Sequence, residues 1–217
     1  MQTPEKLHAS FLFPAVVALL VVQPVLAAFS IASEVLVFPL AGALVASIWS
    51  LDPRGRWFRV GLGLSLALLA AAVLHGVFSS RASIVAAFAG LIALSALSVV
   101  LGVRWLFASA RITVGTLLSA VSVYLLVGVT FGLTYVAMYL FEPSTFSGVS
   151  PAGRSAETAE LMYYSLGTLS TSAFGDILPT HPITRLLANI ESVTGQLYMA
   201  VLVAILITGY ASSPRTE

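Results

Sequence analysis

Long stretches without a charged side chain constrain the fold of this chain more than any other feature. Six runs contain no Lys, Arg, Asp or Glu, and each is 17 to 30 residues long. These runs are residues 7–33, 35–51, 60–80, 82–103, 112–141 and 192–214. A helix needs about 20 predominantly apolar residues to cross a bilayer. The pattern therefore predicts an all-α integral membrane protein with six transmembrane helices, at about 8–29, 31–50, 58–79, 83–107, 112–140 and 184–210.

The composition predicts the lipid bilayer as a partner and argues against several other classes of protein. Hydrophobic residues make up 59% and charged residues 9% of the chain, whereas soluble domains contain about 25% charged residues. There is no cysteine, and the three histidines share no metal-ligand spacing. No Ser-His-Asp pattern or phosphate-binding glycine loop stands out, so we expect no enzyme and no cofactor. The basic residues are scattered and the net charge is +1, so we expect no nucleic acid partner; no soluble partner is indicated.

The positions of lysine and arginine predict the orientation in the membrane. If the N-terminus is cytoplasmic, seven of the ten basic residues lie inside: Lys6, Arg54, Arg56, Arg59, Arg104, Arg111 and Arg215. Short cytoplasmic loops are enriched in Lys and Arg in this way. We therefore expect a multi-pass protein of the cell (inner) membrane with both termini in the cytoplasm. Residues 1–27 leave signal-peptide cleavage open as an alternative, because Val25-Leu26-Ala27 is an acceptable cleavage site.

The segment between the last two long helices is organised differently. A loop rich in Ser, Gly and Pro at 142–155 precedes an apolar segment at 158–171, which is too short to span a membrane. A short helix that enters a membrane and returns as extended chain is allowed only where protein or water surrounds its backbone. We therefore expect a re-entrant helix and loop within a unit of residues 111–217. Residues 1–110 are expected to form a separate four-helix transmembrane bundle.

A resemblance to a known family rests on this second unit. Residues 163–176 read Tyr-Tyr-Ser-Leu-Gly-Thr-Leu-Ser-Thr-Ser-Ala-Phe-Gly-Asp, and residues 184–187 read Thr-Arg-Leu-Leu. Residues 195–204 then read Gly-Gln-Leu-Tyr-Met-Ala-Val-Leu-Val-Ala. This succession resembles the pore helix, selectivity filter and inner helix of tetrameric potassium channels, whose filter commonly reads Thr-Val-Gly-Tyr-Gly-Asp. The resemblance implies a homotetramer in which each subunit contributes one filter loop to a pore for a monovalent cation, K⁺.

The resemblance also implies the residues of the ion-binding site. The filter would consist of Thr171, Ser172, Ala173, Phe174 and Gly175, with K⁺ held by backbone carbonyls and the Thr171 hydroxyl, and Asp176 at the outer mouth. Carbonyls that replace the water shell of an ion must point toward one axis. Such alternating backbone needs left-handed torsions, which suit glycine and cost other residues about 1–2 kcal/mol. Gly175 meets this demand, whereas Ala173 stands where the family has its first glycine. Asp176 is either a turn-capping residue or an attractor of cations.

Further positions in this unit carry expectations. Glu191 lies about two turns into the last helix, and an ionisable residue inside a membrane helix usually has a partner. We expect it to pair near the re-entrant helix, with pore lining or proton sensing as alternatives. Gly195 is a candidate gating hinge by resemblance, or else a glycine that allows close helix packing. At the start of the re-entrant helix, Glu157 and Glu160 are expected to suit the positive helix end, with Ser155 or Thr158 as companion caps. Attraction of cations to the outer mouth is the alternative role for these two carboxylates.

These observations predict a cation channel that does not sense voltage. A voltage sensor needs several Arg or Lys within the membrane field, and residues 83–103 contain none. K⁺ is the expected permeant ion, with selectivity weakened by Ser172 and Ala173. The alternative is a non-conducting membrane sensor or scaffold that retains the channel fold.

Overall fold

The computed structural model describes residues 81–108, 113–172 and 174–211, together with a few helical positions within 13–21 and 59–66. This part of the chain is mostly helical: α4 (Arg81–Ala108), α5 (Val114–Phe141), η1 (Pro143–Thr145), β1 (Phe146–Ser147), α6 (Arg154–Leu169), β2 (Leu178–Pro179) and α7 (Pro182–Ala211). By length and composition, α4, α5 and α7 could each cross a membrane. Their ends lie within two residues of the helix ends predicted from the sequence. Most of the first three predicted helices, and hence of the predicted four-helix bundle, lies outside the described residues.

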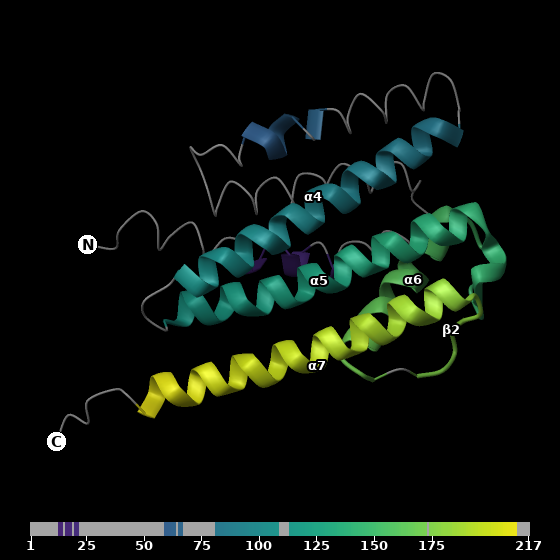
Figure 1. The fold of residues 1–217 in the computed structure, drawn as a ribbon. Helices are drawn as coiled ribbons and strands as arrows, with labels where there is room; N and C mark the ends of the chain where they lie inside the picture. Colours follow the sequence, from purple (N-terminus) through teal and green to yellow (C-terminus); the bar gives the residue numbers. More distant parts are fainter. Residues whose placement is uncertain are drawn as a thin grey trace.

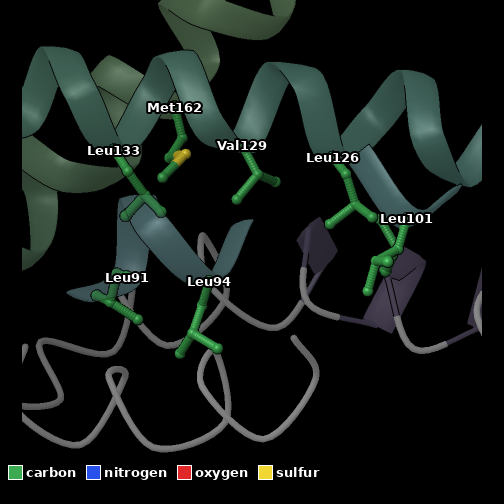
Figure 2. Close-up of a cluster of buried hydrophobic side chains, with 8 residues drawn as sticks. Leu91, Leu94, Leu101, Leu126, Val129, Leu133 and Met162 are labelled. Carbon is green, nitrogen blue, oxygen red and sulfur yellow. The ribbon is translucent and has the colours of Figure 1, made fainter. Parts of the chain in front are cut away.

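Helices α4 and α5 pack against each other along an apolar core. Both helices are apolar on all sides, which is typical of helices surrounded by protein and lipid. Figure 2 shows the buried side chains of this core converging from α4, α5 and α6: Leu91, Leu94, Leu101, Leu126, Val129, Leu133 and Met162. One polar contact lies within the same interface, where the hydroxyls of Ser95 and Thr130 are 2.7 Å apart. A hydrogen bond between helices satisfies both groups where no water is present.

The short helix α6 lies between α5 and α7, close to where α5 ends and α7 begins (Figure 1). Two glycines of α5, Gly128 and Gly132, allow this close approach. A Cβ atom on Gly128 would lie 2.8 Å from Leu166 Cδ2, and one on Gly132 would lie 2.5 Å from Met162 Sδ. Small residues spaced by four are a common way for helices to approach closely in a membrane.

An aromatic cluster fixes the start of the loop that precedes α6. Tyr135 of α5, Phe146 of β1 and Tyr164 of α6 contact one another edge to face, with ring centroids 5.3 to 5.4 Å apart. Such edge-to-face pairs are favourable beyond the area that they bury. The cluster therefore connects three segments that are distant in sequence.

The loop before α6 also pairs with the segment after it. Strands β1 and β2 are antiparallel, with Phe146 opposite Pro179 and Ser147 opposite Leu178. Gly148 has a φ of +89°, and a Cβ atom there would lie 2.0 Å from the carbonyl oxygen of Asp176. Only glycine fits this close approach in that conformation. The two-residue strands were not predicted from the sequence.

The prediction that Ser155 or Thr158 caps α6 was wrong, whereas the predicted acidic residue Glu157 does lie in the first turn. The helix begins after Gly153, which makes no side-chain cap, four residues earlier than the predicted start at 158. Thr158 Oγ1 instead donates to the carbonyl of Arg154, and Ser155 Oγ has no hydrogen-bond partner within the described residues. The carboxylate of Glu160 accepts a hydrogen bond of 2.7 Å from the backbone N–H of Ser150, which connects α6 to the preceding loop.

Candidate functional site

The end of α6 is a helix-capping motif centred on Thr171. The N–H of Ser172 donates to the carbonyl of Gly167 at 2.8 Å, and the N–H of Thr171 donates to the carbonyl of Thr168 at 3.0 Å. This pair of bonds is the Schellman motif, whose left-handed position is usually glycine. Here Thr171 occupies that position with a φ of +59°. A β-branched residue there costs about 1–2 kcal/mol, and such strain is often found at functional sites.

Hydroxyl groups are concentrated around this helix end. Ser170 Oγ donates to the carbonyl of Leu166 at 2.8 Å and lies 3.1 Å from Ser172 Oγ. Both serines line an open cavity of about 370 Å³ beside α6. The other lining residues come from α6, from Phe174 and from the first helical segment: Leu20, Ala159, Met162, Tyr163, Leu166 and Gly167. The cavity is largely apolar apart from these hydroxyls.

Phe174 and Gly175 of the predicted filter lie, with Asp176, in an exposed segment. Phe174 is 72% exposed, and its ring stacks on Tyr163 with centroids 5.7 Å apart and planes 9° from parallel. Gly175 has a φ of +81°, a left-handed torsion of the kind expected from the sequence. Ala173 lies outside the described residues. The stacking partner Tyr163 was missed by sequence reasoning, although both aromatic residues belong to the segment 163–176 on which the resemblance rests.

Asp176 is held by two contacts at the end of this segment. Its Oδ1 accepts a hydrogen bond of 3.1 Å from the N–H of the next residue, Ile177. The Asp176 carboxylate also lies near the Tyr163 hydroxyl, close enough to influence its ionisation. Loss of hydration, and then this carboxylate, raise the pKa of Tyr163. Tyr163 therefore contacts both Phe174 and Asp176 and fixes the exposed segment to α6.

Glu191 joins α7 to both neighbouring helices. Its carboxyl group is completely buried, as are the side chains of Tyr135 and Ser165. The Tyr135 hydroxyl donates to Glu191 Oε2 at 2.7 Å, and Ser165 Oγ is hydrogen-bonded to Oε1. Ser165 Oγ also lies 2.8 Å from the carbonyl oxygen of Gly128. Glu191 thus lies against α5 and α6 rather than on the exposed face of α7.

Gly195 packs directly against the last residue of α6. The carbonyl oxygen of Leu169 would lie 2.0 Å from a Cβ atom at Gly195, and it accepts a hydrogen bond of 3.1 Å from Tyr124. On the next turn of α7, the Tyr198 hydroxyl donates to the carbonyl of Ala120 at 2.7 Å. This geometry is that of a close packing glycine; a role as gating hinge stays a prediction.

One comparison with known protein families supports the assignment of this chain as an ion channel. Residues 112–210 match a protein-family model described as an ion channel. The matched segment contains α5, α6, the exposed segment and all of α7 except its last residue. The match supports an ion channel family and points to a channel or transporter rather than an enzyme, located in a membrane. No curated protein and no solved structure matches the chain.

Proposed function

We propose that this protein is a homotetrameric channel that conducts monovalent cations passively, with K⁺ as the permeant ion. The observation that carries the proposal is the succession of α5, the short helix α6, a segment with left-handed Thr171 and Gly175, and α7. Except for the last residue of α7, these elements fall within the part of the chain that matches the ion channel family model. A short helix followed by backbone with left-handed torsions between two possible spans is suited to presenting carbonyls to an ion.

In this proposal residues 171–175 form the selectivity filter. Backbone carbonyls and the Thr171 hydroxyl bind the dehydrated ion, and Asp176 at the outer mouth attracts cations. A single loop cannot surround an ion, so four copies are needed around one axis. The exposure of Phe174 and of one side of α7 supports this arrangement, because lipid and neighbouring subunits would cover these surfaces. The exposed apolar residues of α7 include Ile183, Leu186, Ile190, Val193, Leu197 and Met199.

The proposed selectivity is weaker than that of a filter with two glycines. Ser172 and Ala173 replace an apolar β-branched residue and a glycine of the pattern that the chain resembles. A residue with a Cβ atom resists left-handed torsions, and any change is repeated four times around the axis. We also propose cytoplasmic termini in the cell (inner) membrane, since the Lys and Arg distribution supports that orientation.

A flux assay in liposomes tests the proposal. Purified tetramers are reconstituted with high internal K⁺, and efflux is followed after dilution into low K⁺, with Na⁺-loaded liposomes in parallel. We expect K⁺ efflux that exceeds Na⁺ efflux. Gly175→Ala is the matched variant, because its φ of +81° disfavours any side chain; efflux should fall strongly. Folded tetramers without any cation flux would refute the channel and favour a non-conducting sensor or scaffold.

A further inference from the structure

Three completely buried polar side chains meet where α5, α6 and α7 come together. They are Tyr135, Ser165 and Glu191, one from each helix. In the described part of the chain, the titratable groups that face this carboxyl are tyrosines: Tyr124 and Tyr135 of α5 and Tyr164 of α6. None of them is a cation. A carboxylate in such surroundings would therefore have no opposite charge to compensate it.

The number of hydrogen atoms in this cluster indicates the protonation state of Glu191, independently of the charges that surround it. Three contacts join its oxygen atoms: Tyr135 Oη to Glu191 Oε2, Ser165 Oγ to Glu191 Oε1, and Ser165 Oγ to the Gly128 carbonyl. Each contact requires one hydrogen. The two hydroxyls supply only two, because a serine or tyrosine hydroxyl donates once. A proton on Glu191 supplies the third: Glu191 donates to Ser165, Ser165 donates to Gly128, and Tyr135 donates to Glu191.

We propose that Glu191 is a positioning residue for the filter and that it acts as the neutral carboxylic acid. It holds α6 between α5 and α7 by donating a hydrogen bond to Ser165 and accepting one from Tyr135. The assignment of a role in conduction rests on the proposed channel function. The protonation state and the anchoring of α6 do not depend on it.

The position of the cluster explains how it reaches the filter. Ser165 and Leu169 are one turn apart on α6, and Glu191 and Gly195 are one turn apart on α7. Glu191 contacts Ser165 while Gly195 contacts Leu169, so two consecutive turns of the two helices pack in register. Thr171 follows Leu169 by two residues. Loss of the hydrogen bond between Glu191 and Ser165 would therefore displace the last turn of α6, which leads directly into Thr171, the first residue of the proposed filter.

Three substitutions separate the neutral acid from a carboxylate. Glu191→Gln keeps one donor and one acceptor in the same shape, so the amide N–H₂ can donate to Ser165 while its oxygen accepts from Tyr135. We expect K⁺ efflux and the K⁺-to-Na⁺ ratio of this variant to stay within about twofold of the wild type. Glu191→Asp is too short to keep both contacts, and Glu191→Ala keeps neither. Efflux through these two variants should fall about tenfold or more, since buried partners lose their hydrogen bonds.

Infrared spectroscopy of the wild-type tetramer reports the protonation state of Glu191 directly, which measurements of flux or stability alone do not. At neutral pH we expect a carbonyl stretch of a protonated carboxylic acid, which disappears in Glu191→Gln and persists in the control Glu142→Gln. Glu142 is an exposed carboxyl on the loop after α5. Absence of this band from the wild type, or a Glu191→Gln variant as impaired as Glu191→Asp, would overturn the proposal.

The two proposals fail in different ways. If the wild type carries no flux, the channel function fails, and the infrared band together with the thermal stability of the tetramer still tests the state of Glu191. Wild-type stability in Glu191→Gln and reduced stability in Glu191→Asp would then support the neutral acid. Equal loss of stability in both variants would contradict it.

Discussion

A Cβ atom on Gly195 of α7 would lie only 2.0 Å from the carbonyl oxygen of Leu169, the last residue of α6. Real Cβ atoms do not come this close to another heavy atom, so backbone must move if the glycine is replaced. The same carbonyl accepts a hydrogen bond from Tyr124 of α5. The end of α6 is therefore held from both sides, directly before the proposed filter.

Gly195→Ala should destabilise the protein by about 1–3 kcal/mol, since a methyl group forced into a packed interface costs that much. The measurement is the free energy of unfolding in detergent. Gly63→Ala is the matched control, because a Cβ atom on this helical glycine meets nothing within 4 Å; it should be neutral or slightly stabilising. Equal stability of the Gly195→Ala protein and the wild type would contradict the packing role and favour the hinge.

Replacement of Thr171 should separate stability from conduction. Thr171→Gly removes a β-branched residue from a left-handed torsion, so the free energy of unfolding should rise by about 1–2 kcal/mol. The same change removes the hydroxyl that is proposed to bind the ion, so K⁺ flux or selectivity should fall. Thr171→Ser keeps the hydroxyl and should retain most of the flux. A Thr171→Gly variant that is less stable than the wild type would contradict the strained torsion.

Met162 and Gly132 should show energetic coupling. A Cβ atom on Gly132 would lie 2.5 Å from Met162 Sδ, so Gly132→Ala alone should cost about 1–3 kcal/mol. In the double variant with Met162→Ala, the new methyl group has room, and the cost of Gly132→Ala should largely disappear. A double-mutant cycle of unfolding free energies measures this coupling. Strict additivity of the two substitutions would show that α5 and α6 do not pack as described.

Tyr163 should make stability depend on pH in the alkaline range. Its pKa is raised in the folded protein by lost hydration and by the Asp176 carboxylate. The stabilisation that the neutral Tyr163 side chain gives to the folded protein is therefore fully present below the pKa of an unfolded tyrosine, about 10. It is lost as the pH rises through the higher pKa of Tyr163 in the folded protein. Thermal unfolding measured from about pH 8 to pH 11 should show this loss in the wild type. Tyr163→Phe keeps the ring that stacks on Phe174 and should not show this loss of stability at alkaline pH. A Tyr163→Phe variant with the same pH profile as the wild type would contradict the contact of Tyr163 with Asp176.

The sequence predicted the long helices well and the site geometry only in part. The ends of α4 and α5 were predicted to within two residues because bilayer thickness sets the length of an uncharged run. Those of α7 were predicted as closely, although this helix contains Arg185 and Glu191. The start of α6 was not, since Gly153 provides no side-chain cap to recognise. The left-handed torsion of Thr171 was missed because β-branched residues disfavour it. The partners of Glu191 and the close approach of Gly195 to Leu169 depend on contacts between distant residues, which periodicity does not reveal.

Ala173 is the residue on which the proposed ion selectivity depends most. It stands where the resembling filters have glycine, and four copies would surround the axis. Ala173→Gly should therefore raise the K⁺-to-Na⁺ flux ratio, because a left-handed torsion becomes accessible without cost. Parallel K⁺ and Na⁺ efflux assays check this, and a lower ratio in the variant would contradict the assignment of Ala173 to the filter.

The central claim is that residues 171–175 form a cation-selective pore in a tetramer. Electrical recording from the purified tetramer in a planar bilayer, with K⁺ on one side and Na⁺ on the other, tests it most directly. We predict a measurable current whose reversal potential lies toward the K⁺ equilibrium potential and which Gly175→Ala abolishes. A folded tetramer that carries no current, or a current that Gly175→Ala leaves unchanged, would contradict the claim.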